Sequence, residues 1–206
     1  MSVGCVAETV DNHRIQRLAP GAAGGDIAAG GLPSNWNGGE SSNLLKNPHG
    51  FFVTTSGDMY IADTDNHRIQ KWLKGASEAT TVAGGNEQGE AANQLNNPHG
   101  VFVDDLGNVY VADTENHRVQ KWEQGAEEGT TIAGGNGQGG AANQLSHPED
   151  IFIDTSEGIY IADTYNSRVL KKEVGDTEWT IIIGEGYATY KEYAAYVYVS
   201  AKMNVY

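Results

Sequence analysis

Cysteine is almost absent from this sequence: the 206 residues contain one, Cys5, which cannot form a disulfide bond within the chain. No Asn-x-Ser/Thr sequon occurs, and the first residues lack the charged segment and apolar run of a signal peptide. These absences slightly favour an intracellular location and leave the compartment unknown.

Long apolar runs and positive charge are also scarce. No stretch approaches the roughly 18 apolar residues of a membrane-spanning helix, which excludes an ordinary helical membrane protein. The chain carries 13 Lys plus Arg against 27 Asp plus Glu, a net charge of -14. Because such a surface repels phosphate, we expect no binding to nucleic acid or anionic membranes and favour a basic or neutral partner.

Helical periodicity is missing as well, and the chain instead contains a sequence repeat. Tyr60–Trp72 (YIADTDNHRIQKW) recurs fifty positions later as Tyr110–Trp122 and again as Tyr160–Lys172, with a degenerate copy at Val6–Arg17. A period of this size is typical of arrays whose units bury their apolar faces only by stacking on their neighbours.

Each repeat unit predicts four short strands. A proline with an apolar run opens the unit, as in Pro48–Val53, and a glycine turn leads to the Tyr-x-Ala-Asp strand. Another turn leads to a third strand such as Arg68–Leu73, and a fourth such as Thr80–Ala83 ends at paired glycines. Units of four β-branched and aromatic strands predict an all-β propeller of antiparallel blades. We interpret the Gly-, Ala- and Ser-rich residues 18–47 as a surface connection.

The pattern Pro-x-Gly, apolar strand, glycine turn, Tyr-(Val/Ile)-Ala-Asp-Thr-x-Asn-His-Arg resembles the NHL repeat over residues 6–184. The resemblance implies an NHL-type β-propeller, which usually has six blades in that family. Kelch propellers share the period and the double glycine. In this chain, however, the glycines close the fourth strand, and the Asp-x-x-Asn-x-Arg signature is that of NHL repeats.

The predicted organisation is a single propeller domain over residues 1–206. It contains a partial blade at 6–47, blades at 48–97, 98–147 and 148–184, a degenerate linker at 185–196, and the start of a further blade at 197–206. About four blades are therefore present. Two interpretations stay open, a closed four-bladed ring and an incomplete, open propeller, and the resemblance favours the second. Exposed strand edges would then promote self-association.

A repeated polar signature surrounds the turn between the second and third strands. An aspartate and an arginine five residues apart lie across this turn, so we expect a hydrogen-bonded pair that supports each blade. The asparagine between them suits a turn position with positive φ. Because a feature present in every unit is typical of scaffolding, we assign a structural role to Asp63, Asn66, Arg68, Asp113, Asn116, Arg118, Asp163, Asn166 and Arg168.

The histidines suggest one candidate metal site. His49 and His99 follow the prolines at the start of the innermost strands, and Glu149 holds the same place in the next unit. Equivalent residues of successive blades converge on the central channel, so His49, His99 and Glu149 could bind a divalent metal such as zinc or calcium. We interpret His13, His67 and His117 as turn-packing residues at the surface.

A second resemblance bears on this site. The peptidyl-amidoglycolate lyase family, which has an NHL-like propeller, carries zinc-binding histidines in similar Pro-His segments and a tyrosine resembling Tyr165 in Asp163–Arg168. Here Glu149 replaces a histidine, the loop around Tyr165 is one residue shorter, and no third zinc histidine occurs in matching context.

Other motifs have simpler interpretations. Gly135–Gly140 matches G-x-G-x-x-G but joins two predicted strands, whereas a dinucleotide site needs a helix after the motif. Trp36, Trp72 and Trp122 could anchor a partner, and for the last two we favour packing between blades.

The sequence thus favours a non-enzymatic NHL-repeat scaffold without a cofactor, which binds a protein or peptide partner through loops at one rim of the propeller. The alternative is a metal-dependent enzyme, similar to the peptidyl-amidoglycolate lyases, that acts at the central channel.

Overall fold

The computed structural model describes residues 4–8, 13–18, 25–31 and 38–184. Trp36 and the predictions for residues 185–196 and 197–206 lie outside this described part. No helix within it has the length and apolar character needed to span a membrane. Its regular elements are strands and three short 3-10 helices, η1 (Thr64–Asn66), η2 (Thr114–Asn116) and η3 (Thr164–Asn166).

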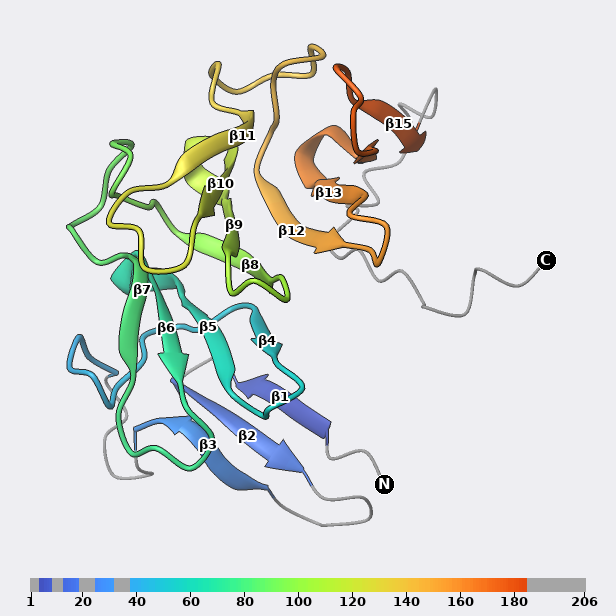
Figure 1. Cartoon of the computed structure of the whole chain (residues 1–206). Coiled ribbons are helices and arrows are strands. Elements are labelled where there is room, and N and C mark those ends of the chain that lie inside the picture. Colours follow the sequence, from blue (N-terminus) through green and yellow to red (C-terminus); the bar gives the residue numbers. More distant parts are fainter. Residues whose placement is uncertain (1–3, 9–12, 19–24, 32–37, 185–206) are drawn as a thin grey trace.

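The strands form four antiparallel sheets, one for each copy of the repeat. In each four-stranded sheet the strands pair in chain order, and Figure 1 shows the four sheets following one another along an open arc. The described sheets therefore form an incomplete propeller. Blade 1 contains β1 (Gly4–Glu8), β2 (Arg14–Leu18) and β3 (Asp26–Gly30), and blade 2 contains β4 (Phe51–Val53), β5 (Met59–Asp63), β6 (Arg68–Trp72) and β7 (Thr80–Gly84). Blade 3 contains β8 (Pro98–Val103), β9 (Val109–Asp113), β10 (Arg118–Trp122) and β11 (Thr130–Gly134), and blade 4 contains β12 (Pro148–Ile153), β13 (Ile159–Asp163), β14 (Arg168–Lys172) and β15 (Thr180–Ile183).

One strand lies where the sequence predicted a loop. β3 falls within residues 18–47, which we had interpreted as a surface connection, and it pairs with β2 from Arg14↔Gly30 to Arg17↔Asp26. The sequence Asp-Ile-Ala-Ala-Gly has little β-branched character, so local preference did not reveal it. Pairing with β2 fixes its extended conformation, and β3 takes the place of the Thr-Thr strands β7 and β11.

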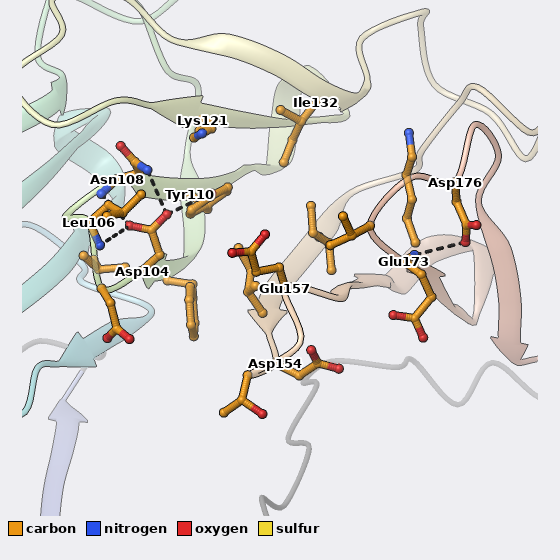
Figure 2. Close-up of a pocket in the computed structure, with 18 of the residues that line it drawn as sticks. Asp104, Leu106, Asn108, Tyr110, Lys121, Ile132, Asp154, Glu157, Glu173 and Asp176 are labelled. Atoms are coloured by element: carbon orange, nitrogen blue, oxygen red, sulfur yellow. Dashed lines mark hydrogen bonds between the residues drawn. The ribbon is translucent and has the colours of Figure 1, made fainter.

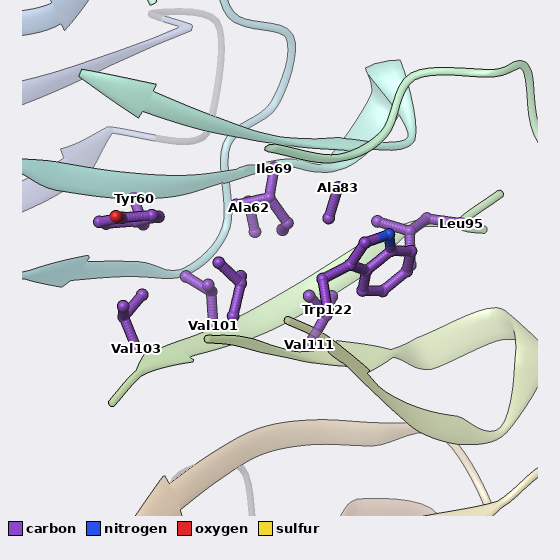
Figure 3. Packing of buried hydrophobic residues seen from close by; sticks show 10 residues of the cluster. Tyr60, Ala62, Ile69, Ala83, Leu95, Val101, Val103, Val111 and Trp122 are labelled. Carbon is purple, nitrogen blue, oxygen red and sulfur yellow. The ribbon is translucent and has the colours of Figure 1, made fainter. Parts of the chain in front are cut away.

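In blades 2 to 4, the second strand is the most deeply buried. Every residue of β5 and β9 is buried, because neighbouring strands cover both edges and neighbouring blades cover both faces. Figure 3 shows the interface between blades 2 and 3, where Tyr60 and Ile69 of blade 2 face Val101 and Trp122 of blade 3. Trp122 is 1% exposed, so the expectation that it packs between blades is confirmed.

The turn after the second strand differs from its predicted conformation in one respect. Asn66 ends the 3-10 helix η1, and the residue with positive φ is the following one, His67, with φ 51°. His117 and Ser167 adopt φ 52° at the same position, so the assignment of positive φ to the asparagines was wrong. The asparagine keeps a helical conformation, from which its side-chain amide donates to the aspartate of the same turn, 2.8 Å away in blade 2.

Hydrogen bonds also cross from each blade to the next. Thr64 Oγ1 donates to the carbonyl oxygen of Pro98 at 2.8 Å, and the backbone N–H of Asn97 donates to His67 Nδ1 at 3.1 Å. The N–H of His147 donates in the same way to His117 Nδ1, at 3.3 Å. The signature histidines therefore do more than pack at a surface turn, because they accept hydrogen bonds from the start of the next blade.

Candidate functional site

The aspartate–arginine pairs lie in contact, as the repeat signature predicted. In blade 3, Arg118 Nε lies 2.7 Å from Asp113 Oδ2, and Asn116 Nδ2 donates to the same oxygen at 2.9 Å. The other aspartate oxygen accepts the backbone N–H of Asn96 at 2.7 Å. Blades 2 and 4 repeat this geometry with Arg–Asp distances of 2.7 and 2.6 Å.

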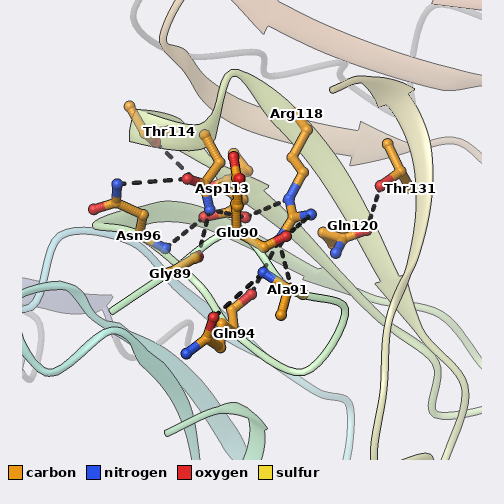
Figure 4. Close-up of polar contacts among 12 residues, drawn as sticks. Gly89, Glu90, Ala91, Gln94, Asn96, Asp113, Thr114, Arg118, Gln120 and Thr131 are labelled. Carbon is orange, nitrogen blue, oxygen red and sulfur yellow. Dashed lines mark hydrogen bonds and ion pairs between the residues drawn. The ribbon is translucent and has the colours of Figure 1, made fainter. Parts of the chain in front are cut away.

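Each pair also holds the segment that links two blades. The Arg118 guanidinium donates to the carbonyl oxygens of Glu90, Ala91 and Gln94, at 2.7, 3.0 and 3.1 Å (Figure 4). Burial raises the pKa of Asp113, and the hydrogen bonds from Asn116, Asn96 and Arg118 oppose the rise. With the aspartate fully buried and the guanidinium donating to backbone carbonyls, these groups are occupied by contacts inside the protein.

The predicted channel residues do come together in one pocket. His49, His99, Glu149 and the neighbouring Asp150 line a cavity of about 290 Å³ at the start of the innermost strands. The His49 and His99 rings stack with centroids 4.0 Å apart and planes within 9° of parallel. Burial, together with the positive charge of His49 and His147, lowers the pKa of His99 to about 4, while burial lowers that of His49 and raises that of Glu149.

The geometry of this pocket does not fit a metal ion as the side chains lie. A metal binds close to the plane of an imidazole, and two parallel planes about 4 Å apart share no such position. His99 Nδ1 is buried without a hydrogen-bond partner, yet no group of three His, Cys, Asp or Glu in the described ranges is arranged to hold a metal. Shared coordination would require at least one ring to rotate.

Tyr165 lies in a separate aromatic group. Its ring centroid is 4.0 Å from that of His147, which in turn lies 4.5 Å from that of His117. Tyr165 is 55% exposed and does not line the pocket of His49 and His99.

The rim opposite the aspartate–arginine turns and the histidine pocket differs in sequence from one copy of the repeat to the next. We call it the variable rim, and it comprises the turns 54–58, 73–79, 104–108, 123–129, 154–158 and 173–179. These turns join the first strand to the second and the third to the fourth, so the antiparallel topology places them all at one end of the blades. Large apolar side chains are exposed there: Leu73 at 56%, Leu106 at 76% and Val174 at 66%.

A larger cavity opens at the variable rim, between blades 3 and 4. Its volume is about 760 Å³, and Figure 2 shows Asp104 and Tyr110 of blade 3 on one side and Glu173 and Asp176 of blade 4 on the other. Sequence reasoning missed this site. The available signal was Lys172, which replaces the tryptophan of the two preceding copies.

The cavity combines carboxylates with an apolar wall. Six carboxylates and two ammonium groups line it, together with aromatic and aliphatic side chains. Asp104 accepts hydrogen bonds from the N–H groups of Leu106 and Asn108 at 3.0 and 2.9 Å and from the Tyr110 hydroxyl at 3.1 Å. Burial acts to raise the pKa of Asp104, but the hydrogen bonds outweigh it and the pKa lies below its ordinary value. The carboxylate is therefore ionised at neutral pH.

Comparisons with known proteins agree with this architecture. The family model of the NHL repeat matches residues 45–72 and 95–122. No curated protein matches the chain.

Among solved structures, an auxiliary nutrient binding protein from Bacteroides thetaiotaomicron is similar, with a TM-score of 0.55, 18% identity, and coverage of 74% of this chain and 41% of that one. A catalytically inactive variant of virginiamycin B lyase from Staphylococcus aureus, solved with quinupristin, is similar with a TM-score of 0.54 and 12% identity. The match covers 86% of this chain and 50% of that one. A Bacteroides thetaiotaomicron protein of unknown function is similar with a TM-score of 0.52 and 19% identity, and the match covers 74% of this chain and 40% of that one.

The chain thus spans half or less of the length of these proteins, and identities this low concern the fold alone. The fold and the repeat agree with each other, because both matched segments begin before the first strand of a blade and end with its third strand. Residues 45–72 and 95–122 are NHL repeats, and these two matches support an NHL-repeat family for the chain.

Proposed function

We propose that this chain is a non-enzymatic scaffold that binds a protein or peptide partner through the variable rim. One observation carries the proposal. Three of the large exposed apolar residues, Leu73, Leu106 and Val174, lie on this rim, in turns whose sequences differ between copies. Apolar side chains that gather on one surface are typical of interaction sites.

By contrast, the polar residues of the other rim indicate a structural role. Its aspartates, asparagines and arginines are the same in all three complete copies and bond to one another and to the linking segments. A partner needs groups that face solvent and that distinguish one blade from the next, and these groups lie on the variable rim. The net charge of -14 favours a basic or neutral partner.

A peptide-display selection tests this proposal. The full chain is compared with a variant carrying Leu73→Ser, Leu106→Ser and Val174→Ser, and with the control Tyr165→Ser, which removes an exposed aromatic side chain from the other rim. We expect the wild-type chain and the control to enrich common peptides and the triple variant to lose them. Peptides that bind the triple variant as tightly as the wild-type chain would contradict the proposal.

A second candidate function is a metal-dependent reaction at the channel pocket. The observation in its favour is that His49, His99 and Glu149 line one cavity, as the sequence predicted. Isothermal titration with zinc or calcium, comparing the wild-type chain with His49→Ala/His99→Ala, decides it. Stoichiometric binding that the double variant loses supports a metal site, whereas equal weak binding by both proteins removes this candidate.

A further inference from the structure

We infer that the cavity between blades 3 and 4 is the recognition pocket of the variable rim and that it takes an arginine side chain of a bound peptide. This inference rests on the proposed function and names its site and the chemistry of its ligand. Four steps carry it: the missing tryptophan, the altered turn, the excess of carboxylates and the apolar wall.

The first step concerns a side chain that fills the other two interfaces. Trp72 packs in the cluster between blades 1 and 2, and Trp122 packs in the cluster between blades 2 and 3, with exposures of 2% and 1%. The equivalent residue between blades 3 and 4 is Lys172, which lines the cavity. A flexible side chain with a charged end replaces a large rigid ring there, so this interface is open at the variable rim.

Two positions of blade 4 have exchanged their large and small side chains relative to blade 3, so the opening is a consequence of how blade 4 packs. A Cβ atom added at Gly129 would lie 2.9 Å from the Trp122 ring, so these two positions are adjacent in blade 3. In blade 4 the same two positions carry Trp179 and Lys172, and the lysine Nζ lies 5.7 Å from the centroid of the tryptophan ring. The large ring has moved from the third strand to the residue just before the fourth strand, where it forms a wall of the cavity.

The second step concerns the turn at the mouth of the cavity. Gly57 and Gly107 have φ values of 90° and 81°, whereas the equivalent residue in blade 4 is Glu157, with φ 63°. A glutamate in the left-handed region is strained relative to glycine. Strained residues of this kind are found preferentially at functional sites. Figure 2 shows Glu157 between the two halves of the cavity.

The residue after Glu157 is Gly158, and it leaves room for a second carboxylate, that of Glu173. Asp58 and Asn108 hold the third-to-fourth-strand turn by accepting the N–H groups of Lys74 and Gln124 at 2.9 and 3.2 Å. Blade 4 has Gly158 instead. A Cβ atom there would lie 3.0 Å from Glu173 Oε2, so a side chain would displace the Glu173 carboxylate.

The third step is the charge of the cavity. Its carboxylates belong to Asp104, Asp105, Asp154, Glu157, Glu173 and Asp176, and its ammonium groups belong to Lys121 and Lys172. Asp104 and Asp154 accept the N–H groups of their own turns. Asp176 accepts the N–H of Glu173, and Glu173 Oε1 pairs with Lys171. Asp105 and Glu157, together with the second oxygen of Glu173, remain to bind a cation at the mouth. Because a guanidinium stays ionised and presents several donors in one plane, it suits a group of carboxylates better than an ammonium does.

The fourth step is the wall that receives the rest of the side chain. Phe102, Tyr110 and Trp179 line the cavity together with Ile153 and Ile159. The aliphatic stem of an arginine buries apolar area against such a wall while its charged end reaches the mouth. Two of these rings already have a cation nearby, since Lys121 Nζ lies 5.6 Å from the Tyr110 centroid and Lys172 Nζ lies near Trp179.

The test uses an array of heptapeptides with a central arginine and varied flanking residues, together with the same array carrying citrulline, a neutral isostere of arginine. The full wild-type chain should bind arginine peptides that it does not bind as citrulline peptides. Lys172→Trp/Trp179→Gly rebuilds the packing of blade 3 and should lose this preference. Glu157→Gln/Glu173→Gln keeps the shape and should weaken arginine binding by about tenfold, as two partly exposed charge pairs allow.

Controls separate this inference from the proposed function. Glu87→Gln/Glu90→Gln makes the same change of charge in exposed residues outside the variable rim and should leave binding unchanged. Peptides that bind equally well with citrulline, or that bind Lys172→Trp/Trp179→Gly as tightly as the wild-type chain, would overturn the inference and leave the scaffold proposal standing. If neither array binds and the display selection also finds nothing, both fail.

Glu157 offers a measurement that does not depend on the rebuilt interface. Glu157→Gly should raise the midpoint of urea unfolding, because glycine relieves the strained backbone, and should weaken binding of the arginine peptides. A variant that is more stable and binds equally well would remove Glu157 from the recognition pocket.

Discussion

At the scale of single residues, Arg118 makes the contacts that matter most for stability. It is paired with a fully buried aspartate and donates to three carbonyl oxygens of the preceding linker. We expect Arg118→Ala to lower the free energy of unfolding by about 3–5 kcal/mol, because a buried charge loses its partner. Urea unfolding followed by tryptophan fluorescence measures this.

The conservative change Arg118→Lys tests the geometry of the same contact. An ammonium group cannot reach Asp113 and the linker carbonyls together, so this variant should recover less than half of the lost stability. Lys74→Ala, which removes an exposed cation, is the control and should change stability by less than about 0.5 kcal/mol. Equal stability of the Arg118→Lys variant and the wild-type chain would mean that charge alone holds the linker.

Asp104 gives the variable rim a defined dependence on pH. Its pKa in the folded state lies below the unfolded value of about 3.9, so its contribution to stability is present above that pH and is lost as the pH falls through the folded pKa. Asp104→Asn should therefore cost about 1 kcal/mol at pH 7 and much less at pH 3. Asp105→Asn, which changes an exposed neighbour, is the control and should change stability by less than about 0.5 kcal/mol at pH 7. If Asp104→Asn costs the same free energy at both pH values, the lowered pKa of Asp104 is contradicted.

How far single residues could be predicted depended on whether their partners lie in the same turn. Asp63 and Arg68 flank one turn, so spacing alone indicated their contact. The hydrogen bond of His67 joins it to the N–H of Asn97, and nothing in the spacing of one repeat reports on a group in the next. The positive φ of His67 was missed for a related reason, since asparagine is the commoner residue in that conformation and stands beside it.

At the scale of elements, the turns between the second and third strands connect neighbouring blades. His117 combines φ 52° with a hydrogen bond accepted from the N–H of His147. His117→Asn should cost about 1 kcal/mol in urea unfolding, because asparagine tolerates the backbone conformation but does not place an acceptor at the same point. Ser167→Asn, at the equivalent turn of blade 4, serves as the control and should be close to neutral. Equal stability of the two variants would show that the inter-blade hydrogen bond contributes little.

Strands were predicted where their residues favour extended structure and missed where only pairing imposes it. The Thr-Thr segments of β7 and β11 have clear β-propensity and end at paired glycines, and both are strands. β3 holds the same place in blade 1 with the sequence Asp-Ile-Ala-Ala-Gly, and its partner β2 decides its conformation.

At the scale of the whole molecule, packing between blades dominates. Trp122 fills the interface between blades 2 and 3, and Trp122→Ala should lower the free energy of unfolding by about 3–5 kcal/mol. Trp179→Ala, at a partly exposed ring beside an existing cavity, should cost clearly less. The two variants are compared by chemical unfolding under the same conditions. Similar losses would indicate that the interface between blades 3 and 4 is as well filled as the others.

The arc of blades could be predicted from the sequence, but the recognition pocket could not. Strand number, order and repeat length follow from one copy of the pattern, and copying it along the chain gives the arc. The pocket depends on which residues of blade 3 face which residues of blade 4, as Tyr110 and Lys172 do. Comparing copies position by position marks Lys172, Trp179 and Glu157 as departures, although the sequence does not show that all three line one cavity.

Among the described residues, hydrogen bonds such as that from Thr114 to the carbonyl of Pro148, 34 residues later, join blades that are adjacent in the chain. Under mechanical load applied to its two ends, the molecule should therefore yield in steps, one blade at a time. Each step should release about 50 residues, or roughly 165–180 Å of extended chain. The interface that lacks a buried tryptophan should give way at the lowest force, so that the force–extension record begins at the recognition pocket.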